Sequence, residues 1–331
     1  MSDRPVILVT GGAGYIGSHA CRALDAAGYQ VLVFDNLSTG HRHFVRGPLI
    51  VGDLLDGVAL ERAFARHDVA AVMHFAAASL VGESMADPQK YYLNNVNGTL
   101  SLLHAMREAG CRRLVFSSTG AVYGHADSKA LPESHPCAPI NTYGASKWMI
   151  ERILADYRNA YGLGSFCLRY FNASGADEAG GIGELRDHET HLIPRAMMAM
   201  QGHLEDFAVF GTDYDTPDGT AIRDYIHVTD LAAAHVAALK LLMQGHKGGA
   251  FNLGTGTGFS VREILAAIEA ETGRKVPHVI RPRRAGDPAC LVADPTAARE
   301  VLQFAARHSE LATIIRTAWA WHQKAHPLKA A

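Results

Sequence analysis

Tyr143 and Lys147 stand four residues apart in the segment YGASK, and this pair can remove a proton from an alcohol. On a helix, two residues at this spacing project from the same face. A phenol titrates at about pH 10 when it is unperturbed, and a neighbouring ammonium lowers its pKa by favouring the phenolate. We therefore predict that Tyr143 is a general base and that Lys147 lowers its pKa.

A base of this kind oxidises an alcohol only if hydride leaves the same carbon, and the segment TGGAGYIG supplies a place for a hydride acceptor. Gly11, Gly14 and Gly17 have a GxxGxxG spacing after an apolar strand and at the start of a helix. Glycines there allow a tight turn and close approach of the backbone to a pyrophosphate, which the helix N-terminus favours. The motif predicts a bound dinucleotide.

Two carboxylates follow the next short strands. Asp35 ends the second strand, 18 residues after Gly17, where it can accept hydrogen bonds from the adenosine ribose and repel a 2′-phosphate. This position favours NAD over NADP. Asp53, in the segment VGDL, follows another short strand and is predicted to reach the adenine.

A hydroxyl group is expected beside the base. Thr119 follows Ser117 and Ser118 at the end of an apolar run, and the end of that strand should bring it close to Tyr143. There it can bond the substrate oxygen and relay a proton.

The predicted elements alternate between strand and helix in the first half of the chain, which is typical of a parallel sheet covered on both faces. We predict an α/β fold, a Rossmann-type doubly wound parallel sheet with a smaller mixed α/β C-terminal substrate lobe. The cofactor domain should span residues 1–180, with 224–250 returning to it as a strand and helix, and the lobe most of 181–331. Expected strands cover residues 6–10, 31–34, 70–75, 114–117 and 165–170, and expected helices 15–27, 95–109 and 143–161.

Composition excludes several classes of partner. The net charge is −2, which gives no electrostatic basis for binding nucleic acid or an anionic membrane. No apolar run approaches the roughly 20 residues of a membrane span. Five scattered cysteines without a CxxC pair and a start without a basic, apolar leader indicate a cytoplasmic protein.

His188 and His191 are three residues apart, not the four of a helical zinc pair, so no metal site is expected.

The segments that follow one another along the chain resemble the extended short-chain dehydrogenase/reductase family, and within it the UDP-hexose 4-epimerases. The resemblance covers nearly the whole chain and is carried by TGGAGYIGSH, DNLSTGH, HFAA, VGES, YYLNNVNGTL, FSSTGAVYG, TYGASK, LRYFNASGA, ETHLIP, FGTDYDTPDGTAIRDYIHV, FNLGTGTGFSV and PRRAGDPA. It implies tightly held NAD, oxidation of the hexose at C4, turning of the 4-keto sugar and return of hydride to its other face.

The resemblance also implies roles for individual residues. The catalytic residues would be Tyr143, Lys147 and Thr119. NAD would be held by Gly11, Gly14, Tyr15, Ile16, Gly17, Asp35, Asn36, Asp53, Leu54, Phe75, Ala76, Asn94, Ser117, Tyr143, Lys147 and Tyr170. The UDP-hexose would be held by Thr119, Tyr143, Asn172, His191, Leu192, Phe210, Arg223, Arg284, Asp287 and Cys290.

The chain departs from the family pattern at four of its positions. Ser79 stands where some members carry a lysine, Thr119 where many have serine, and His191 where others have asparagine. Cys290 occupies a wall position that is tyrosine in some members, which leaves room for an N-acetyl group. UDP-N-acetylhexosamines and UDP-pentoses (xylose or arabinose) therefore stay open as alternative substrates.

Two other functions are disfavoured. A 4,6-dehydratase needs an Asp-Glu pair after the threonine, and this chain has Gly120-Ala121 there. A non-catalytic NAD-binding regulator is disfavoured because the Tyr/Lys pair is present. By analogy with the family, the two helices at 95–109 and 143–161 would pair with their copies in a homodimer.

Overall fold

The computed structural model of the protein describes residues 4–125, 130–284 and 287–327. Strand β1 (Val6–Thr10) shows why this chain folds in layers: Ile7 and Val9 enter one buried apolar cluster and Leu8 enters another. Since successive side chains of a strand point to opposite faces, both faces of the sheet must be covered.

The described residues form a seven-stranded parallel sheet in the order β11-β6-β5-β4-β1-β2-β3. The order reverses between β1 and β4, as in doubly wound sheets. In sheet order the strands are β11 (Gly248–Leu253), β6 (Gly164–Tyr170), β5 (Arg113–Thr119), β4 (Val69–His74), β1, β2 (Gln30–Asp35) and β3 (Leu49–Val51).

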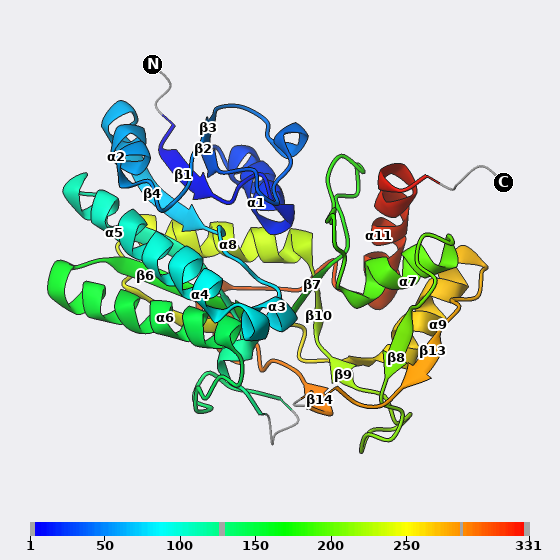
Figure 1. Cartoon of the computed structure of the whole chain (residues 1–331). Helices are drawn as coiled ribbons and strands as arrows, with labels where there is room; N and C mark the ends of the chain where they lie inside the picture. The colour runs from blue at the N-terminus through cyan, green and yellow to red at the C-terminus, as the bar shows by residue number, and fades with distance from the viewer. Residues whose placement is uncertain (1–3, 126–129, 285–286, 328–331) are drawn as a thin grey trace.

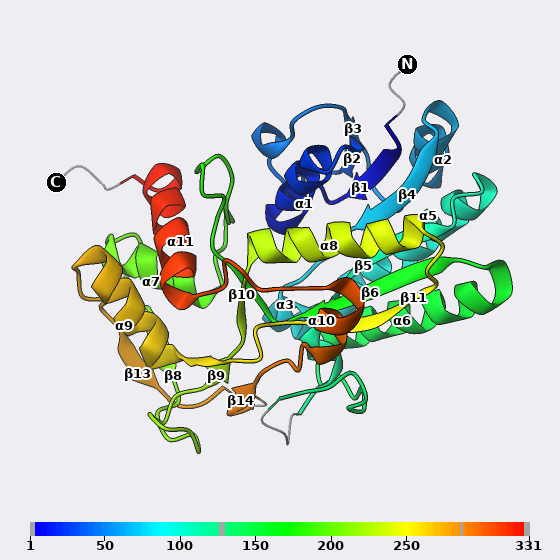
Figure 2. The ribbon, with the colours of Figure 1, turned by 180° about the vertical axis from the view of Figure 1, so that it is seen from behind.

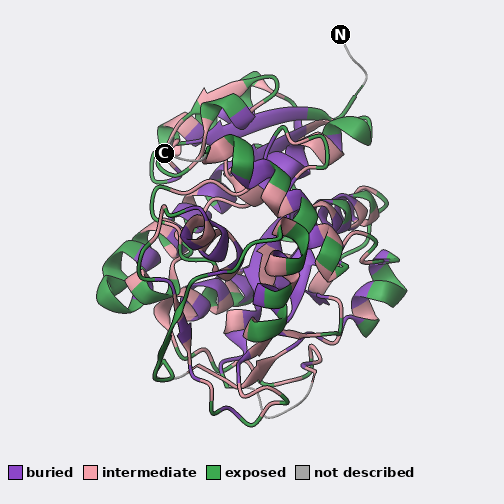
Figure 3. Cartoon of the chain, turned by 90° about the vertical axis from the view of Figure 1, so that its right-hand side faces the viewer, coloured by how far each residue is buried: buried purple, intermediate pink, exposed green. Residues whose placement is uncertain are grey.

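Helices cover each face of this sheet. Figure 1 shows α5 and α6 in front of the sheet, and Figure 2, the view from behind, shows α8 covering the opposite face. One apolar cluster joins the sheet to α1 (Tyr15–Ala26), α8 (Val228–Met243) and α10 (Thr296–Leu302). The opposite cluster joins it to α2 (Gly57–Arg66), α5 (Gly98–Glu108) and α6 (Thr142–Tyr161). Buried residues form the sheet and the helix faces toward it (Figure 3).

A smaller lobe has its own apolar core, which includes Ile193, Ile264 and Ile315. Its helices are α7 (Leu192–Met200), α9 (Val261–Thr272) and α11 (Leu311–Ala325). Short strands pair around them: β7 (Asn172–Ser174) with β10 (Tyr225–His227), β8 (Ala208–Phe210) with β13 (Val279–Arg281), and β9 (Ile222–Arg223) with β12 (Phe259–Ser260) and β14 (Cys290–Leu291).

The remaining elements are short. They are η1 (Arg42–Phe44), α3 (Val81–Ala86), α4 (Pro88–Tyr91), η2 (Tyr92–Asn97) and η3 (Gly120–Val122). Over the residues that the structure describes, no helix combines the length and the apolar character that a membrane span needs.

The predicted fold class is confirmed, and the five predicted strands correspond to β1, β2, β4, β5 and β6. Within residues 224–250, helix α8 packs on the main sheet, and the short strand before it, β10, pairs with β7. The strand that joins the main sheet is β11, at residues 248–253.

Helix α5 also begins differently from its prediction. A π-helical turn, η2, precedes it, and the predicted start at Asn95 falls inside that turn. The buried Asn95 side chain donates to the carbonyl of Ala78 and to the hydroxyl of Ser146, which ties three segments together. π-helical turns within helices often occur at functional sites.

Candidate active site

Gly11 and Gly17, on either side of the turn after β1, have no room for a side chain. Gly11 has φ +71°, and a Cβ added to it would lie 2.5 Å from the amide nitrogen of Ala76. A Cβ on Gly17 would lie 2.1 Å from the carbonyl oxygen of Gly11. The two glycines therefore let β1, the end of β4 and the first turn of α1 approach each other closely.

The N-terminus of α1 opens directly from this turn. Gly14 is its N-cap, no side chain caps the helix, and its first turn contains no acidic residue. The Tyr15 hydroxyl donates to the carbonyl of Gly175 at 2.6 Å, and Ile16 packs beside the apolar cluster on this face of the sheet. An uncapped helix N-terminus behind a glycine turn fits the pyrophosphate of a dinucleotide.

Asp35 lies at the end of β2, where the sequence predicted it, and is buried. Its carboxylate accepts from the amide of Ala13 at 2.9 Å and from the amide of Leu37 at 2.8 Å. Asn36 donates through its side chain to Asp53 at 2.8 Å. The two carboxylates predicted to contact the adenosine are thus connected: Asn36, the neighbour of Asp35, bonds Asp53, and Asp35 itself bonds Ala13 of the glycine turn.

The next part of the cofactor site lies where β4 ends. The amides of Phe75 and Ala76 both donate to the carbonyl of Thr10, at 2.9 and 3.1 Å. Asn94 donates to the side chain of Asn95 at 3.0 Å, and Leu54 packs against Gly98 at the start of α5. These predicted cofactor residues therefore gather at the carboxyl ends of the strands, where ligands bind to doubly wound sheets.

The predicted catalytic residues come together on α6 and the ends of β5 and β6. The Lys147 ammonium donates to the carbonyl of Ser117 at 2.9 Å, and the hydroxyls of Ser117 and Tyr170 are hydrogen-bonded. Thr119 lies beside Tyr143, where its side chain lowers the pKa of the phenol. Asn141 caps α6 by accepting from the amide of Gly144 at 2.8 Å.

Burial dominates the electrostatics of this group. It raises the pKa of Tyr143, and the neighbouring Thr119 side chain and the charge of Arg186 lower it only in part. Burial also lowers the pKa of Lys147 to about 7. Both groups are desolvated together, and the lowering of the Tyr143 pKa by Lys147 stays a prediction for the protein with NAD bound.

A carboxylate that the sequence analysis missed lies one turn further along α6. Glu151 accepts from the Ser118 hydroxyl at 2.5 Å and pairs with Arg169 at 2.5 Å, with 4% of each side chain of the pair exposed. Its charge raises the pKa of Lys147, against the larger effect of burial. The signal was available, because Tyr143, Lys147 and Glu151 follow one another at i, i+4 and i+8 on one helix face.

Predicted substrate residues pair with one another in the lobe. Arg223 at the end of β9 forms an ion pair with Asp287, and the Arg284 guanidinium lies 4.0 Å from the centre of the Phe210 ring. Asn172 donates to the carbonyl of Asp224 at 3.1 Å. Ala285 and Gly286, in the segment PRRAGD, lie outside the described residues.

Two further observations complete this part of the site. Half-buried Cys290 begins β14 and faces Ile222 in the register of the two strands. An open hollow of about 560 Å³ is lined by residues 211–213 and 280–283, which are the sequence neighbours of Phe210 and Arg284.

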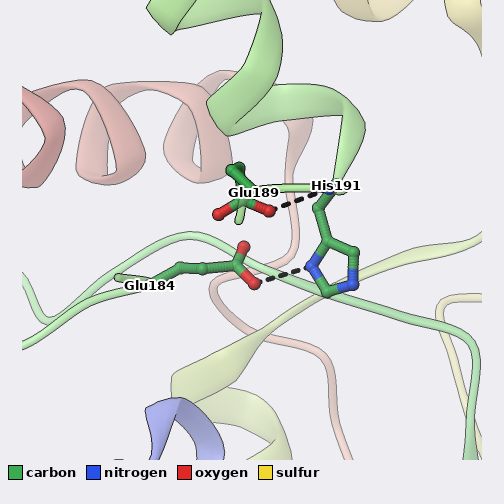
Figure 4. Close-up of side chains that lie close together, drawn as sticks. All are labelled: Glu184, Glu189 and His191. Carbon is green, nitrogen blue, oxygen red and sulfur yellow. Dashed lines mark hydrogen bonds and ion pairs between the residues drawn. The ribbon is translucent and has the colours of Figure 1, made fainter. Parts of the chain in front are cut away.

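Residues 184–191 bring two carboxylates and an imidazole together, which the sequence did not predict. Ligand atoms of Glu184, Glu189 and His191 lie within 4.8 Å of one another (Figure 4). His188, which was considered with His191 as a zinc pair, is not in the group. Arg186 donates to Glu184 at 3.0 Å, so the group already contains a fixed cation. Leu192 begins α7 immediately afterwards.

The doubly wound sheet, the glycine turn and the Tyr–Lys pair define a dinucleotide-binding protein equipped for proton transfer at an alcohol. Residues 7–254 match the NAD dependent epimerase/dehydratase family. The chain therefore belongs to that family.

Individual relatives are similar over nearly their whole length. The UDP-glucose 4-epimerase of Rhizobium meliloti (strain 1021) is 53% identical, over 96% of this chain and 97% of its own. The structure of UDP-glucose 4-epimerase from Brucella ovis in complex with NAD has a TM-score of 0.94 and 53% identity, over 95% and 97% of the two chains. That of the Stenotrophomonas maltophila enzyme, with bound NAD and formylated UDP-arabinopyranose, has a TM-score of 0.94 and 40% identity, over 97% and 98%.

Gly14 and Gly17, at the start of α1, should respond differently to the same added methyl group. Gly17→Ala places a Cβ 2.1 Å from a backbone oxygen, whereas Gly14→Ala places one 3.4 Å away, an ordinary contact. We expect Gly17→Ala to lower the free energy of unfolding by about 1–3 kcal/mol and Gly14→Ala to change it little. Urea denaturation measures both values, and equal losses would contradict this account of the turn.

Proposed function

We propose that the protein interconverts UDP-galactose and UDP-glucose by inverting C4 of the hexose through a 4-keto intermediate, with NAD held in the site. The observation that carries the proposal is that Tyr143, Thr119 and Lys147 lie together at the carboxyl ends of the sheet strands, with the Lys147 ammonium 6.0 Å from the centre of the Tyr143 ring and bonded to the carbonyl of Ser117. The names of the relatives at about 50% identity support the same reaction.

The chain's own residues account for the proton movements. As its phenolate, Tyr143 takes the proton of the C4 hydroxyl and gives it back to the C4 oxygen when the keto group is reduced, while Thr119 bonds the substrate oxygen and relays a proton. Lys147 holds positive charge next to the phenolate before the proton is taken. The chemistry that NAD would supply when bound is a reversible hydride acceptor for C4. Its pyrophosphate would lie against Gly11, Gly14 and the N-terminus of α1, and its adenosine ribose against Asp35.

The lobe must hold UDP firmly while the hexose turns. Arginine binds diphosphates through forked, charge-assisted hydrogen bonds, a role that suits Arg223 and Arg284. Phe210 would lie against the uracil and Asp287 would accept from the ribose. Asn172 and Leu192 would complete the grip on the nucleotide. The ion pair of Arg223 with Asp287 supports this proposal, because it sets both side chains in one place before a ligand arrives.

Removal of the phenolic hydroxyl should stop the reaction without disturbing the fold. Tyr143→Phe is expected to lower kcat by about 10²- to 10⁴-fold, the usual contribution of a general acid–base group. Proton NMR of the anomeric signals, with UDP-galactose and no added NAD, follows the reaction and shows whether the cofactor co-purifies. The matched control is Tyr157→Phe on the same helix.

Wild-type protein should bring the two sugars to a fixed ratio in this assay. If wild type produced no UDP-glucose even after NAD was added, the proposed reaction would be refuted.

A second substrate class is favoured by the small wall residue Cys290. UDP-N-acetylhexosamines fit if that space is open, and the UDP-arabinopyranose derivative in the Stenotrophomonas maltophila structure keeps UDP-pentoses as another alternative. We expect Cys290→Tyr to lower the ratio of turnover of UDP-N-acetylgalactosamine to UDP-galactose by about tenfold or more. Cys290→Ser keeps the volume and should keep the ratio. An unchanged ratio in Cys290→Tyr would contradict the role of this wall.

We also propose that residues 1–180 and 224–250 form the cofactor domain and that most of 181–331 forms the substrate lobe. Helix α10 is an exception within the lobe range, since it packs on the main sheet. A cytoplasmic location is proposed as well, because five scattered cysteines without a CxxC pair are typical of a protein that keeps its thiols reduced. Recovery of the protein outside the cytoplasmic fraction of its host would contradict this.

A homodimer through α5 and α6 is proposed from their exposed apolar side chains. Leu100 is 38% exposed and Met149 44% exposed, one on each helix. Light scattering on a gel-filtration column should give twice the chain mass for wild type and the single mass for the Leu100→Glu, Met149→Glu double variant. The control is Val279→Glu with Ile280→Glu, an exposed apolar pair in the lobe that should not change the mass. A wild-type monomer would contradict the proposal.

A further inference from the structure

The last turn of α11 carries two histidines at the spacing of a helical metal pair. His322 and His326 are four residues apart, and the amide of His326 donates to the carbonyl of His322 at 2.8 Å, which continues the helical turn. Their ring centres lie 4.7 Å apart. Two histidines at i, i+4 share one helix face and can bind one metal ion together. The sequence already contains this pair, which the spacing of His188 and His191 does not provide.

A third histidine reaches the pair from α7. His203 follows the end of α7, where its amide donates to the carbonyl of Met198 at 2.8 Å, and its ring centre lies 6.3 Å from that of His326. Helices α7 and α11 lie side by side in the lobe (Figure 1, Figure 2) and share its apolar core. Imidazoles that bind one tetrahedral metal ion have ring centres about 5 Å apart, so His326 lies near that spacing from both other rings.

Unpartnered polar atoms gather at this corner of the lobe. Over the residues that the structure describes, eight buried side-chain nitrogen or oxygen atoms have no hydrogen-bond partner, and three of them are Nε2 of His322, Nε2 of His203 and Oε1 of Gln201. His322 is 3% exposed and Gln201 8% exposed. Nε2 of Gln201 donates to the carbonyl of His326 at 3.2 Å, which places this amide against the same helix turn. Because buried polar atoms without partners are costly, a ligand that pairs with them would stabilise the lobe.

The charge state of the group suits a metal cation. Burial lowers the pKa of His322 to about 3, and the neighbouring His326 and His203 rings act in the same direction. Burial also lowers the pKa of His326. Neutral imidazole is the form that binds a metal ion. Lys324, on the same turn of α11, donates instead to the carbonyl of Gly180 at 3.2 Å.

A second group of ligand-type side chains lies elsewhere in the lobe. Among the described residues, Glu184, Glu189 and His191 are the group whose ligand atoms lie within 4.8 Å of one another. One oxygen of Glu184, however, already accepts from Nε of Arg186 at 3.0 Å and from Nδ1 of His191 at 2.6 Å. The three histidines would have to turn about their side-chain bonds to converge on one ion, but two of their Nε2 atoms have no hydrogen bond to break first.

We propose that His203, His322 and His326 form a binding site for a divalent transition metal ion such as Zn²⁺, which ties the end of α7 to the last turn of α11. Oε1 of Gln201 is a further donor beside them. Imidazole suits Zn²⁺, Cu²⁺ and Ni²⁺, whereas Mg²⁺ prefers oxygen ligands. The role of this site is structural, and it uses none of the residues proposed to bind NAD or the nucleotide sugar.

The test is calorimetry with ZnCl₂ at neutral pH, on untagged full-length protein that has been dialysed against a chelator. We expect one Zn²⁺ per chain in wild type. His203→Gln and His326→Gln should each lower the affinity by about tenfold or more, because each removes one ligand. Both side chains are only half-buried, so these variants are expected to fold. Saturating Zn²⁺ should raise the Tm of wild type by about 2 °C or more and leave the Tm of the two variants nearly unchanged.

Controls locate the ion. His278→Gln changes an exposed histidine of the same lobe and should bind Zn²⁺ as wild type does. Mg²⁺ should not bind at this site. If wild type bound no Zn²⁺ at micromolar concentrations, the inference would be overturned. It would also be overturned if both histidine variants bound Zn²⁺ normally, and loss of binding in Glu189→Gln would then place the ion at the other group. Epimerisation of UDP-galactose is measured separately, so none of these results decides the proposed function.

Discussion

The buried ion pair between Glu151 and Arg169 is the interaction on which the rest of the candidate site depends. It joins α6, which carries Tyr143 and Lys147, to β6, the strand next to the edge strand β11. Removing one partner of such a pair typically costs about 3–5 kcal/mol, because the other charge is left buried and unpaired. The orientation of the catalytic helix is therefore fixed by charge as well as by apolar packing.

This pair also connects the site to the edge strand β11. Arg169 donates to the Tyr123 hydroxyl at 2.9 Å, and Tyr123 donates to Asn252 of β11 at 2.7 Å. Tyr123 follows η3, the turn that begins directly after Thr119. A continuous buried network thus sets α6, the end of β5 and the last strand of the sheet relative to one another. Fully satisfied networks of this kind make a core rigid.

Desolvation gives the same site its chemical character. Burial pushes the pKa of Tyr143 up, which keeps the phenol neutral, and lowers the pKa of Lys147 to about 7, so that a lysine fully charged in water is only partly charged here near neutral pH. A base that must form an anion then depends on nearby positive charge in a medium of low dielectric constant, where each charge has a larger effect. Glu151 and Arg186 both oppose the effect of burial, since Glu151 favours the charged lysine and Arg186 favours the phenolate.

The sequence by itself determined the elements and the motifs. The alternating apolar strands predicted the sheet, the glycine spacing predicted the turn at Gly11 and Gly17, and the i, i+4 spacing predicted that Tyr143 and Lys147 share a helix face. These features depend on local periodicity and on backbone geometry, which neighbouring residues dictate. Only the tertiary structure decided which distant side chains meet. The pairing of Glu184 with His191, the place of β11 in the sheet and the pKa directions all depend on burial and on contacts between remote segments, which no local pattern encodes.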